Sequence, residues 1–401
     1  MRRPVPALLA LSVLLLSAAC EKKAPTPPAP TGPTAAPTTA KPTNTATPEE
    51  TEILIGEIGS LTGSEANFGL STQRGIELAL REVNAAGGVK GKPVKVRVYD
   101  DQSKPEEAGN AATRLIAQDK VKLILGEAAS TNSMAIADKA QAAQVPQISP
   151  SSTNPKVTEK GDFIFRVCFI DPFQGFVMAR FAKENLGLNR VAVLQDTKSA
   201  YSIGLSDVFV RKFSELGGKI VASEAYGKGD TDFRAQLTAI KAQKPEALWV
   251  PGYYSDVGII ARQARELGLK VPLLGGDGWD SPKLIELGGT AIEGAYFSNH
   301  YSVEEPSPNA QRFVAAFKEA YGEPPDALGA LGYDAAMLAV DAMRRAKDLT
   351  GPSIRDALAE TKNFPGVAGT ITFDDKRNPI KPAVVLQVSG GKYKYVATVQ
   401  P

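Results

Sequence analysis

The chain has 401 residues, of which 43% are apolar and 22% charged, enough for two domains with apolar cores. Its net charge of +2, without a basic stripe, argues against a nucleic-acid-binding surface. One histidine and two cysteines leave little material for a zinc site or histidine-dependent catalysis, so we expect no metal and no cofactor.

Residues 1–20 are expected to be a secretory signal rather than part of the fold. Two arginines open the segment, an apolar run covers 5–16, and small residues lead to Cys20. This order is similar to a bacterial lipoprotein signal, which implies that Cys20 is lipidated and becomes the first mature residue. The leucine usual three residues before the cysteine is replaced by Ser17, so an ordinary signal peptide stays open as the alternative.

Residues 21–51 predict a tether between a membrane anchor and a folded domain. Positions 21–50 contain no Leu, Ile, Val or Phe and consist mostly of Pro, Thr and Ala. Such a composition cannot bury a core and favours an extended, disordered chain. Thirty polyproline-like residues reach roughly 90 Å at most.

From residue 52 onward, apolar runs alternate with segments of helical periodicity. The first set of expected strands covers 53–61, 94–101, 121–125 and 144–149. Three helices are expected between them. The first carries an apolar face on Ile76, Ala79, Leu80 and Val83, and the other two span 106–118 and 131–143. This alternation predicts a parallel sheet with helices on both faces.

A second set of the same kind follows. Its expected strands are 190–196, 219–226, 247–253 and 271–276, with helices near 201–216, 232–243 and 255–267. A connecting strand at 294–301, helices at 308–321 and 326–346, and a β region at 369–399 complete the chain. We therefore expect an α/β protein of two lobes, with the carboxyl ends of their strands facing a ligand cleft.

The segment 121–143 is the most informative single stretch. Its buried strand feeds a helix through a loop of small residues with hydroxyl groups around Ser130. Unpaired N–H groups at the positive end of the helix dipole favour a phosphate or carboxylate there, although a plain capped turn is the alternative.

The folded part of the chain resembles the periplasmic branched-chain amino-acid-binding proteins of ABC transporters. The resemblance covers nearly all of 52–399 and is carried by stretches such as IGEIGSLTG, REVNAAGGVKGKPVKVRVYDD, ILGEAASTNS, LLGGDG and GTITFDDK. It implies a type I solute-binding fold with two doubly wound lobes joined by three crossings, near Phe169, Asn299 and Asn378. Lobe 1 is expected at 52–170 plus 300–378, and lobe 2 at 171–299 plus 379–401.

The resemblance also implies which residues hold the zwitterion of an amino acid. Ser130 falls where the family binds the α-carboxylate, and Ser151 and Thr153 where it binds carboxylate and ammonium. Asp277, in the second lobe, falls where an acidic residue pairs with the ammonium. Opposite charges two bonds apart require an anion cradle and an anionic group facing each other, and this set supplies both.

An aromatic wall is implied by the same resemblance, at Tyr201 and Tyr253 with Phe68 at the mouth. Three departures from the family are visible. Asp277 is one methylene shorter than the familiar Glu, and Ser103 and Ala129 occupy positions that a disulfide joins in well-known members. Trp279 replaces a smaller residue, which predicts a narrower or flatter pocket for the ligand side chain.

Four other residues are of types common in metal or catalytic sites, but we assign no function to them. The Asp100-Asp101 pair at a strand end is interpreted as a solvated cap rather than a metal site. His300 is expected near a lobe crossing. Cys168, whose only possible partner is Cys20, is expected to be buried and inert.

The leading hypothesis is an extracytoplasmic lipoprotein that binds a branched-chain or other apolar amino acid and delivers it to an inner-membrane ABC permease. It is expected to be a monomer in the periplasm or on the cell surface, attached to the membrane by its lipid. A sensor of the same fold, or an amide or urea binder, is the alternative. An enzyme is not expected, because neither a Ser-His pair nor a nucleotide-binding glycine fingerprint is present.

Overall fold

The computed structural model describes residues 51–401. The predicted signal sequence, Cys20 and all of the predicted tether except Thr51 lie outside the described residues. Every element below therefore belongs to the predicted folded part.

The first sheet is parallel, with five strands in the order β2-β1-β3-β4-β5. Its strands are β1 Ile53–Gly59, β2 Val94–Asp100, β3 Ile124–Leu125, β4 Gln147–Ser149 and β5 Ile164–Arg166. The half-exposed strand β2 lies at the edge, as its alternation of Val with Lys, Arg and Tyr predicts. The apolar strand β3 lies in the centre and is fully buried. The sequence pattern thus predicts the position of both strands.

The second sheet has seven strands in the order β14-β13-β10-β9-β8-β6-β7. Its strands are β6 Arg190–Asp196, β7 Lys219–Tyr226, β8 Ala247–Trp249, β9 Leu273–Gly275, β10 Tyr296–Asn299, β13 Ala383–Val388 and β14 Tyr393–Val399. β10 pairs parallel with β9 and antiparallel with β13. The predicted strand 247–253 ends early, at Trp249, shortly before Pro251, which has no N–H for a sheet hydrogen bond.

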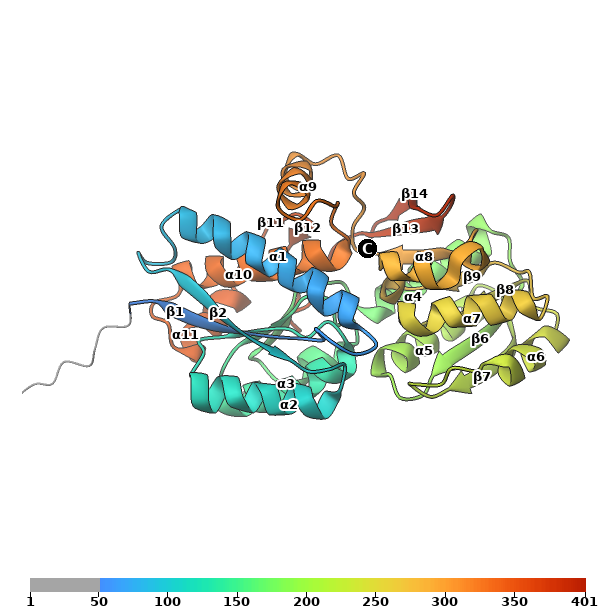
Figure 1. Ribbon diagram of the computed structural model, residues 1–401, viewed down its shortest axis with the longest axis horizontal. Helices are drawn as coiled ribbons and strands as arrows, with labels where there is room; N and C mark the ends of the chain where they lie inside the picture. Colours follow the sequence, from blue (N-terminus) through green and yellow to red (C-terminus); the bar gives the residue numbers. More distant parts are fainter. Residues whose placement is uncertain (1–50) are drawn as a thin grey trace, which may run out of the picture. The chain divides into compact units, whose positions relative to one another are not determined.

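Helices cover the faces of both sheets (Figure 1). Those between the strands of the first sheet are α1 Ala66–Ala85, α2 Pro105–Arg114 and α3 Ser130–Ala143. Those of the second are α4 Asp171–Arg180, α5 Ala200–Glu215, α6 Arg234–Ala242, α7 Tyr254–Glu266 and α8 Pro282–Gly288. The later elements are α9 Pro308–Tyr321, α10 Ala327–Arg345, α11 Gly351–Ala359 and the small hairpin β11 Phe364–Gly366 with β12 Gly369–Ile371. Within 51–401, none of the helices combines the length and apolar character that crossing a membrane requires.

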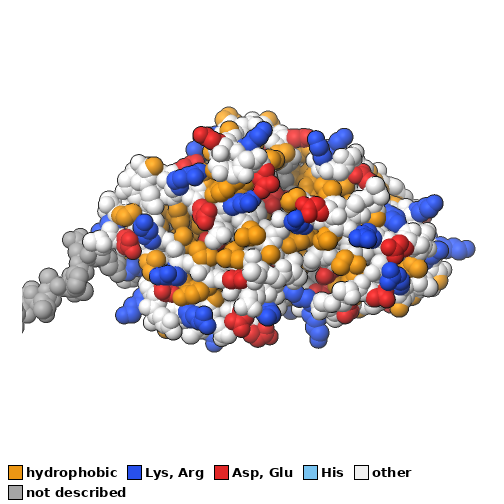
Figure 2. Space-filling model, viewed as in Figure 1, with side chains coloured by type: hydrophobic (Ala, Val, Ile, Leu, Met, Phe, Trp, Pro, Cys, Tyr) orange, Lys and Arg blue, Asp and Glu red, His pale blue; other side chains and the backbone are white. Residues whose placement is uncertain are grey.

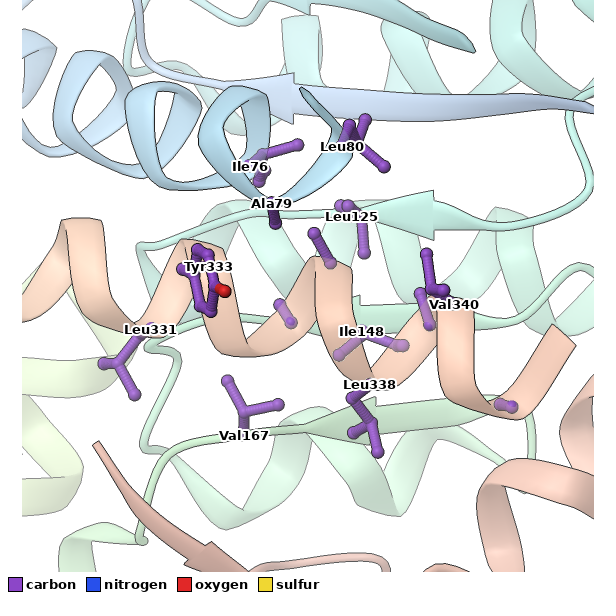
Figure 3. Packing of buried hydrophobic residues seen from close by; sticks show 14 of the residues in the cluster. Ile76, Ala79, Leu80, Leu125, Ile148, Val167, Leu331, Tyr333, Leu338 and Val340 are labelled. Carbon is purple, nitrogen blue, oxygen red and sulfur yellow. The ribbon is translucent and has the colours of Figure 1, made fainter. Parts of the chain in front are cut away.

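The core of the first lobe lies between its sheet and the pair α1 and α10 (Figure 3). Ile76 of α1 and Leu338 of α10 are both fully buried in it. The two helices approach closely through glycine: a Cβ on Gly75 of α1 would lie 2.0 Å from the Gly329 carbonyl oxygen. Any larger residue at Gly75 would force α10 away from α1 and open the core.

The chain passes between the two sheets three times within the described residues. It leaves the first sheet after Arg166, returns after Asn299, and joins the second sheet again at Ala383. Helices α9, α10 and α11 therefore pack with the first sheet, although they follow the strands of the second. The predicted lobe boundaries, at 170, 299 and 378, stay a prediction at the level of single residues.

Charges of both signs are interspersed on the face shown in Figure 2, without a continuous band of either sign. The near balance of 46 basic and 44 acidic residues explains this appearance. On this face, nothing resembles the basic footprint of a nucleic-acid-binding protein.

Candidate ligand-binding site

A small cavity lies where the carboxyl ends of strands from both sheets meet. Six of the seven predicted ligand-binding residues line it: Phe68, Ser130, Ser151, Tyr201, Tyr253 and Asp277. The other lining residues are Ala128, Gly278, His300 and Leu328. The cavity thus joins groups from both lobes, and the contact of each residue with a ligand remains a prediction.

The aromatic wall consists of three rings that hold one another in place. Tyr201 and Tyr253 stack with their centroids 5.2 Å apart and an angle of 10° between the rings. Phe68 meets Tyr253 edge-on at 5.7 Å. Burial raises the pKa of both tyrosines well above the usual value, so their hydroxyl groups stay neutral. The wall is a rigid, uncharged surface suited to an apolar side chain.

Ser130 is the first residue of α3 and places a hydroxyl group at the positive end of the helix. The residue before it, Ala129, is the N-cap and has no side-chain oxygen with which to cap the helix. Ser130 Oγ accepts a hydrogen bond from the Asn154 backbone N–H at 3.3 Å. Ser151 lies beside it, and its Oγ donates to the Ala128 carbonyl oxygen at 3.1 Å. The arrangement suits a carboxylate, as predicted for this loop.

The Ser130 loop is held by hydrogen bonds to Glu127. Glu127 Oε2 accepts from the Ala129 N–H at 2.5 Å, and Oε1 accepts from Ser60. The Glu127 carbonyl oxygen accepts from the hydroxyl groups of Ser133, Ser149 and Ser152. Burial, followed by the neighbouring Asp101, raises the pKa of Glu127 well above its usual value. These contacts fix the loop at Ala129, one of the two positions where well-known members of the resembling family carry a disulfide.

Asp277 lies on a tight turn that begins at the end of β9, with glycine on both sides. A Cβ on Gly276 would lie 2.6 Å from the Tyr201 hydroxyl oxygen, and one on Gly278 would lie 2.8 Å from the Gly252 carbonyl oxygen. The Gly278 N–H donates to the Tyr201 hydroxyl oxygen at 3.1 Å. A side chain at Gly276 or Gly278 would clash with these atoms, so both positions require glycine. The turn can therefore approach Tyr201 closely, which places the Asp277 carboxylate against the aromatic wall.

Both oxygens of Asp277 accept a hydrogen bond from a buried neutral donor. Gln174 Nε2 donates to Oδ1 at 3.0 Å, and His300 Nε2 lies 2.9 Å from Oδ2. Gln174 is itself oriented by Ser298, whose hydroxyl donates to Oε1 at 3.0 Å. Asp277 is only 7% exposed, and among residues 51–401 its carboxylate has no hydrogen bond from a Lys or Arg side chain.

Thr153 is not among the residues that line the cavity. It is fully buried one layer behind Asp277, where Gln174 Nε2 donates to its Oγ1 at 3.4 Å. Its carbonyl oxygen accepts from the Asp171 N–H at 2.9 Å. Burial raises the pKa of Asp171 to about 7. In this structure Thr153 supports the Asp277 network from behind, and its predicted contact with a ligand stays a prediction.

The prediction for one residue near the cavity is wrong, and the expectation for a second was incomplete. The prediction that Trp279 narrows the pocket is wrong: the side chain is fully buried in the second lobe, and its Nε1 donates to the Val250 carbonyl oxygen at 3.0 Å. His300 lies at a crossing, as expected, because the chain returns to the first lobe after Asn299, and it also lines the cavity. It directly follows β10, which runs parallel to β9, and Asp277 comes shortly after β9. Residues that follow neighbouring parallel strands lie at the same edge of the sheet, and this rule could have placed His300 near Asp277.

The interpretation of Asp100-Asp101 as a solvated cap is half right. Asp100 accepts from the N–H groups of Leu61 and Thr62 at the surface. Asp101 is fully buried instead, where it accepts from Ser60 and Asn132 beneath the Ser130 loop. Among residues 51–401, no three His, Cys, Asp or Glu side chains are grouped as metal ligands would be.

The prediction that Cys168 is buried is confirmed, and its chemical inertness stays a prediction. Within the described part of the chain the thiol forms no disulfide, it is fully buried, and burial raises its pKa to about 12.

Several polar contacts join the lobes beside the cavity. Lys228 Nζ forms an ion pair with Glu65 Oε2 at 2.9 Å. The Asn67 N–H donates to the Tyr254 hydroxyl at 3.1 Å, and the Ala200 N–H donates to Thr131 Oγ1 at 3.0 Å. The protein itself therefore supplies bonds across the cleft.

Comparison with known proteins gives consistent matches along the folded part. A model of the family described as periplasmic binding protein matches residues 52–392. A curated protein from Brucella suis, Leu/Ile/Val-binding protein homolog 1, is 30% identical over 351 residues, or 86% of this chain and 93% of the relative.

Two solved structures extend this likeness to three dimensions. A leucine-binding protein from Thermotoga maritima is 43% identical with a TM-score of 0.85, over 87% of this chain and 99% of that chain. A branched-chain amino acid transporter substrate-binding protein from Streptococcus pneumoniae, in complex with isoleucine, is 36% identical with a TM-score of 0.83. That match covers 87% of this chain and 100% of the other.

Proposed function

Because the chain belongs to the periplasmic binding protein family, we propose that its interlobe cavity binds a branched-chain or other apolar amino acid. As a member of a binding-protein family it is not an enzyme. The type I fold predicted from the sequence agrees with the solved relatives over their whole length.

The main support for the proposal is that one cavity combines groups suited to bind an anion with an anionic side chain. Ser130 and the start of α3 come from the first lobe, and the Asp277 carboxylate comes from the second. The former suit a ligand carboxylate and the latter suits an ammonium group, so an amino-acid zwitterion contacts both lobes at once.

The remaining lining supports an apolar side chain. Phe68, Tyr253, Ala128 and Leu328 contribute apolar surface, and none of them carries a charge. A charged or strongly polar ligand side chain would lose its hydration there without a compensating partner. The Leu/Ile/Val-binding relative, the leucine-binding relative and the isoleucine complex favour the same ligand class.

The cellular part of the proposal is delivery of this amino acid to an ABC permease by a protein anchored through Cys20. It rests on the family and on the lipoprotein-like order of the first 20 residues. Disruption of the gene should lower uptake of radiolabelled leucine by the source organism. Normal uptake with a lost transcriptional or chemotactic response to leucine would favour the sensor alternative.

A thermal-shift screen tests the ligand class, because a ligand that binds only the folded state must stabilise it. We expect leucine, isoleucine or valine to raise the melting temperature most, and calorimetry should give a 1:1 complex. Urea and acetamide are the matched neutral probes for the amide-binding alternative. Stabilisation by an amide, and by none of the twenty amino acids, would refute the proposal.

A further inference from the structure

His300 is in contact with the proposed ammonium-binding group. Its Nε2 lies 2.9 Å from Asp277 Oδ2, and its ring packs against Phe169 with the centroids 3.7 Å apart. The side chain is 1% exposed and borders the cavity. It is therefore held from one side by an aromatic ring and directed toward the carboxylate from the other.

The hydrogen bond defines the tautomer of His300. A carboxylate oxygen only accepts, so the hydrogen must be on Nε2. Burial lowers the pKa of the imidazole, although Asp277 acts in the opposite direction, so the ring is neutral. Nδ1 then carries a lone pair, and it has no hydrogen-bond partner among the described residues.

A neutral donor fixes the carboxylate without cancelling its charge. His300 takes one lone pair of Oδ2 and Gln174 takes one of Oδ1, which holds the carboxylate plane in place. Each oxygen retains a second lone pair for a donor in the cavity. Lys381, whose positive charge also lowers the pKa of His300, donates to the Val167 carbonyl oxygen rather than to Asp277.

We propose that His300 is a positioning and specificity-determining residue, which orients the uncompensated Asp277 carboxylate so that the cavity prefers ligands with an α-ammonium group. This inference rests on the proposed function, since it assumes an amino acid in the cavity. Gln174 acts as the second support of the same carboxylate. The selectivity of the site for amino acids over the corresponding carboxylic acids then depends on His300 as well as on Asp277.

The test compares two substitutions and two ligands on the folded protein. H300F keeps a ring against Phe169 and removes the N–H donor, whereas H300Q supplies an amide donor in its place. Calorimetric titrations use L-leucine and its deamino analogue, 4-methylpentanoate, with competition against leucine where direct heats are small. C168S is the control, because Cys168 is a buried neighbour that does not line the cavity.

H300F should weaken leucine binding by about 10- to 100-fold, as loss of a hydrogen bond to a charged group does. Binding of 4-methylpentanoate should change by less than about threefold, because it has no ammonium to place on Asp277. H300Q should recover most of the leucine affinity, and C168S should retain it.

Three results would overturn the inference. Equal losses for the two ligands in H300F would show that His300 only maintains the fold of the cavity. Unchanged leucine affinity in H300F would show that Asp277 needs no such support. Failure of H300Q to recover affinity would show that the donor is not what matters. If the wild-type protein binds no amino acid at all, the proposed function fails, independently of His300.

Discussion

Replacement of Asp277 by Asn is the most direct test of the proposed ammonium site. In the structure both carboxylate oxygens face neutral N–H donors, from Gln174 and His300. An asparagine at this position offers one oxygen and one NH2 group, so its NH2 group must face the N–H donor of either Gln174 or His300. D277N therefore loses the charge and also one of the two hydrogen bonds that orient the group.

The expected cost follows from the burial of the site. Asp277 is 7% exposed, so in D277N a ligand ammonium placed against the asparagine amide would be largely dehydrated and unpaired. Removal of one partner from a buried charge pair costs about 2–5 kcal/mol. This corresponds to an affinity about 30-fold to several thousand-fold lower. D277A should be at least as damaging as D277N.

Calorimetric titration with the best amino acid from the thermal-shift screen measures this loss, with S130A as the matched control. S130A should cost about tenfold at most, because it removes one hydroxyl while the backbone N–H groups at the start of α3 remain. The three variants should still fold, since each residue lies at the cavity and not in either apolar core. Wild-type affinity in D277N would refute the ammonium assignment and favour an amide ligand.

Three further outcomes are expected. A palmitate analogue should label the protein made in a bacterial host, and label that persists in C20S would place the anchor elsewhere. Saturating ligand should lower the radius of gyration in small-angle scattering, because the two lobes close by a hinge on the ligand, and an unchanged radius would contradict closure. Cys168 should resist Ellman's reagent at pH 8 in folded C20S protein, because burial raises the pKa of its thiol to about 12, and should react once guanidinium unfolds the chain.

The fold was predictable because its signals are local and periodic. Val, Lys, Arg and Tyr alternate in β2 as an edge strand requires, and the continuous apolar run at β3 marks a central strand. Their order in the sheet agrees with both patterns. The helices α4, α8 and α11 were not predicted, and with α4 the support of Asp277 by Gln174 was missed, since a contact between residues 103 positions apart leaves no local pattern.

The candidate site was predictable only through resemblance, and only in part. Phe68 and Tyr201 lie on helices of opposite lobes, and no periodicity in the sequence indicates that they share a cavity. Trp279 was misplaced because its direction depends on the 3₁₀ turn Asp277–Trp279, which points the indole into the core. His300 was undervalued because a single histidine is usually structural, and its value here comes from the carboxylate it meets.

The polar contacts that join the lobes affect how ligand affinity can evolve. They include the Lys228–Glu65 ion pair and the hydrogen bonds from Asn67 to Tyr254 and from Ala200 to Thr131. A protein that closes by its own bonds binds any ligand with an affinity scaled by the fraction of molecules already closed. Lys228 is one-third exposed, so K228M should weaken every ligand by a similar, small factor, about two- to fivefold. Asp277 and its supports should alter the ranking of ligands instead. The strength of binding and the choice of ligand are thus adjustable at different residues, and selection can change one while leaving the other in place.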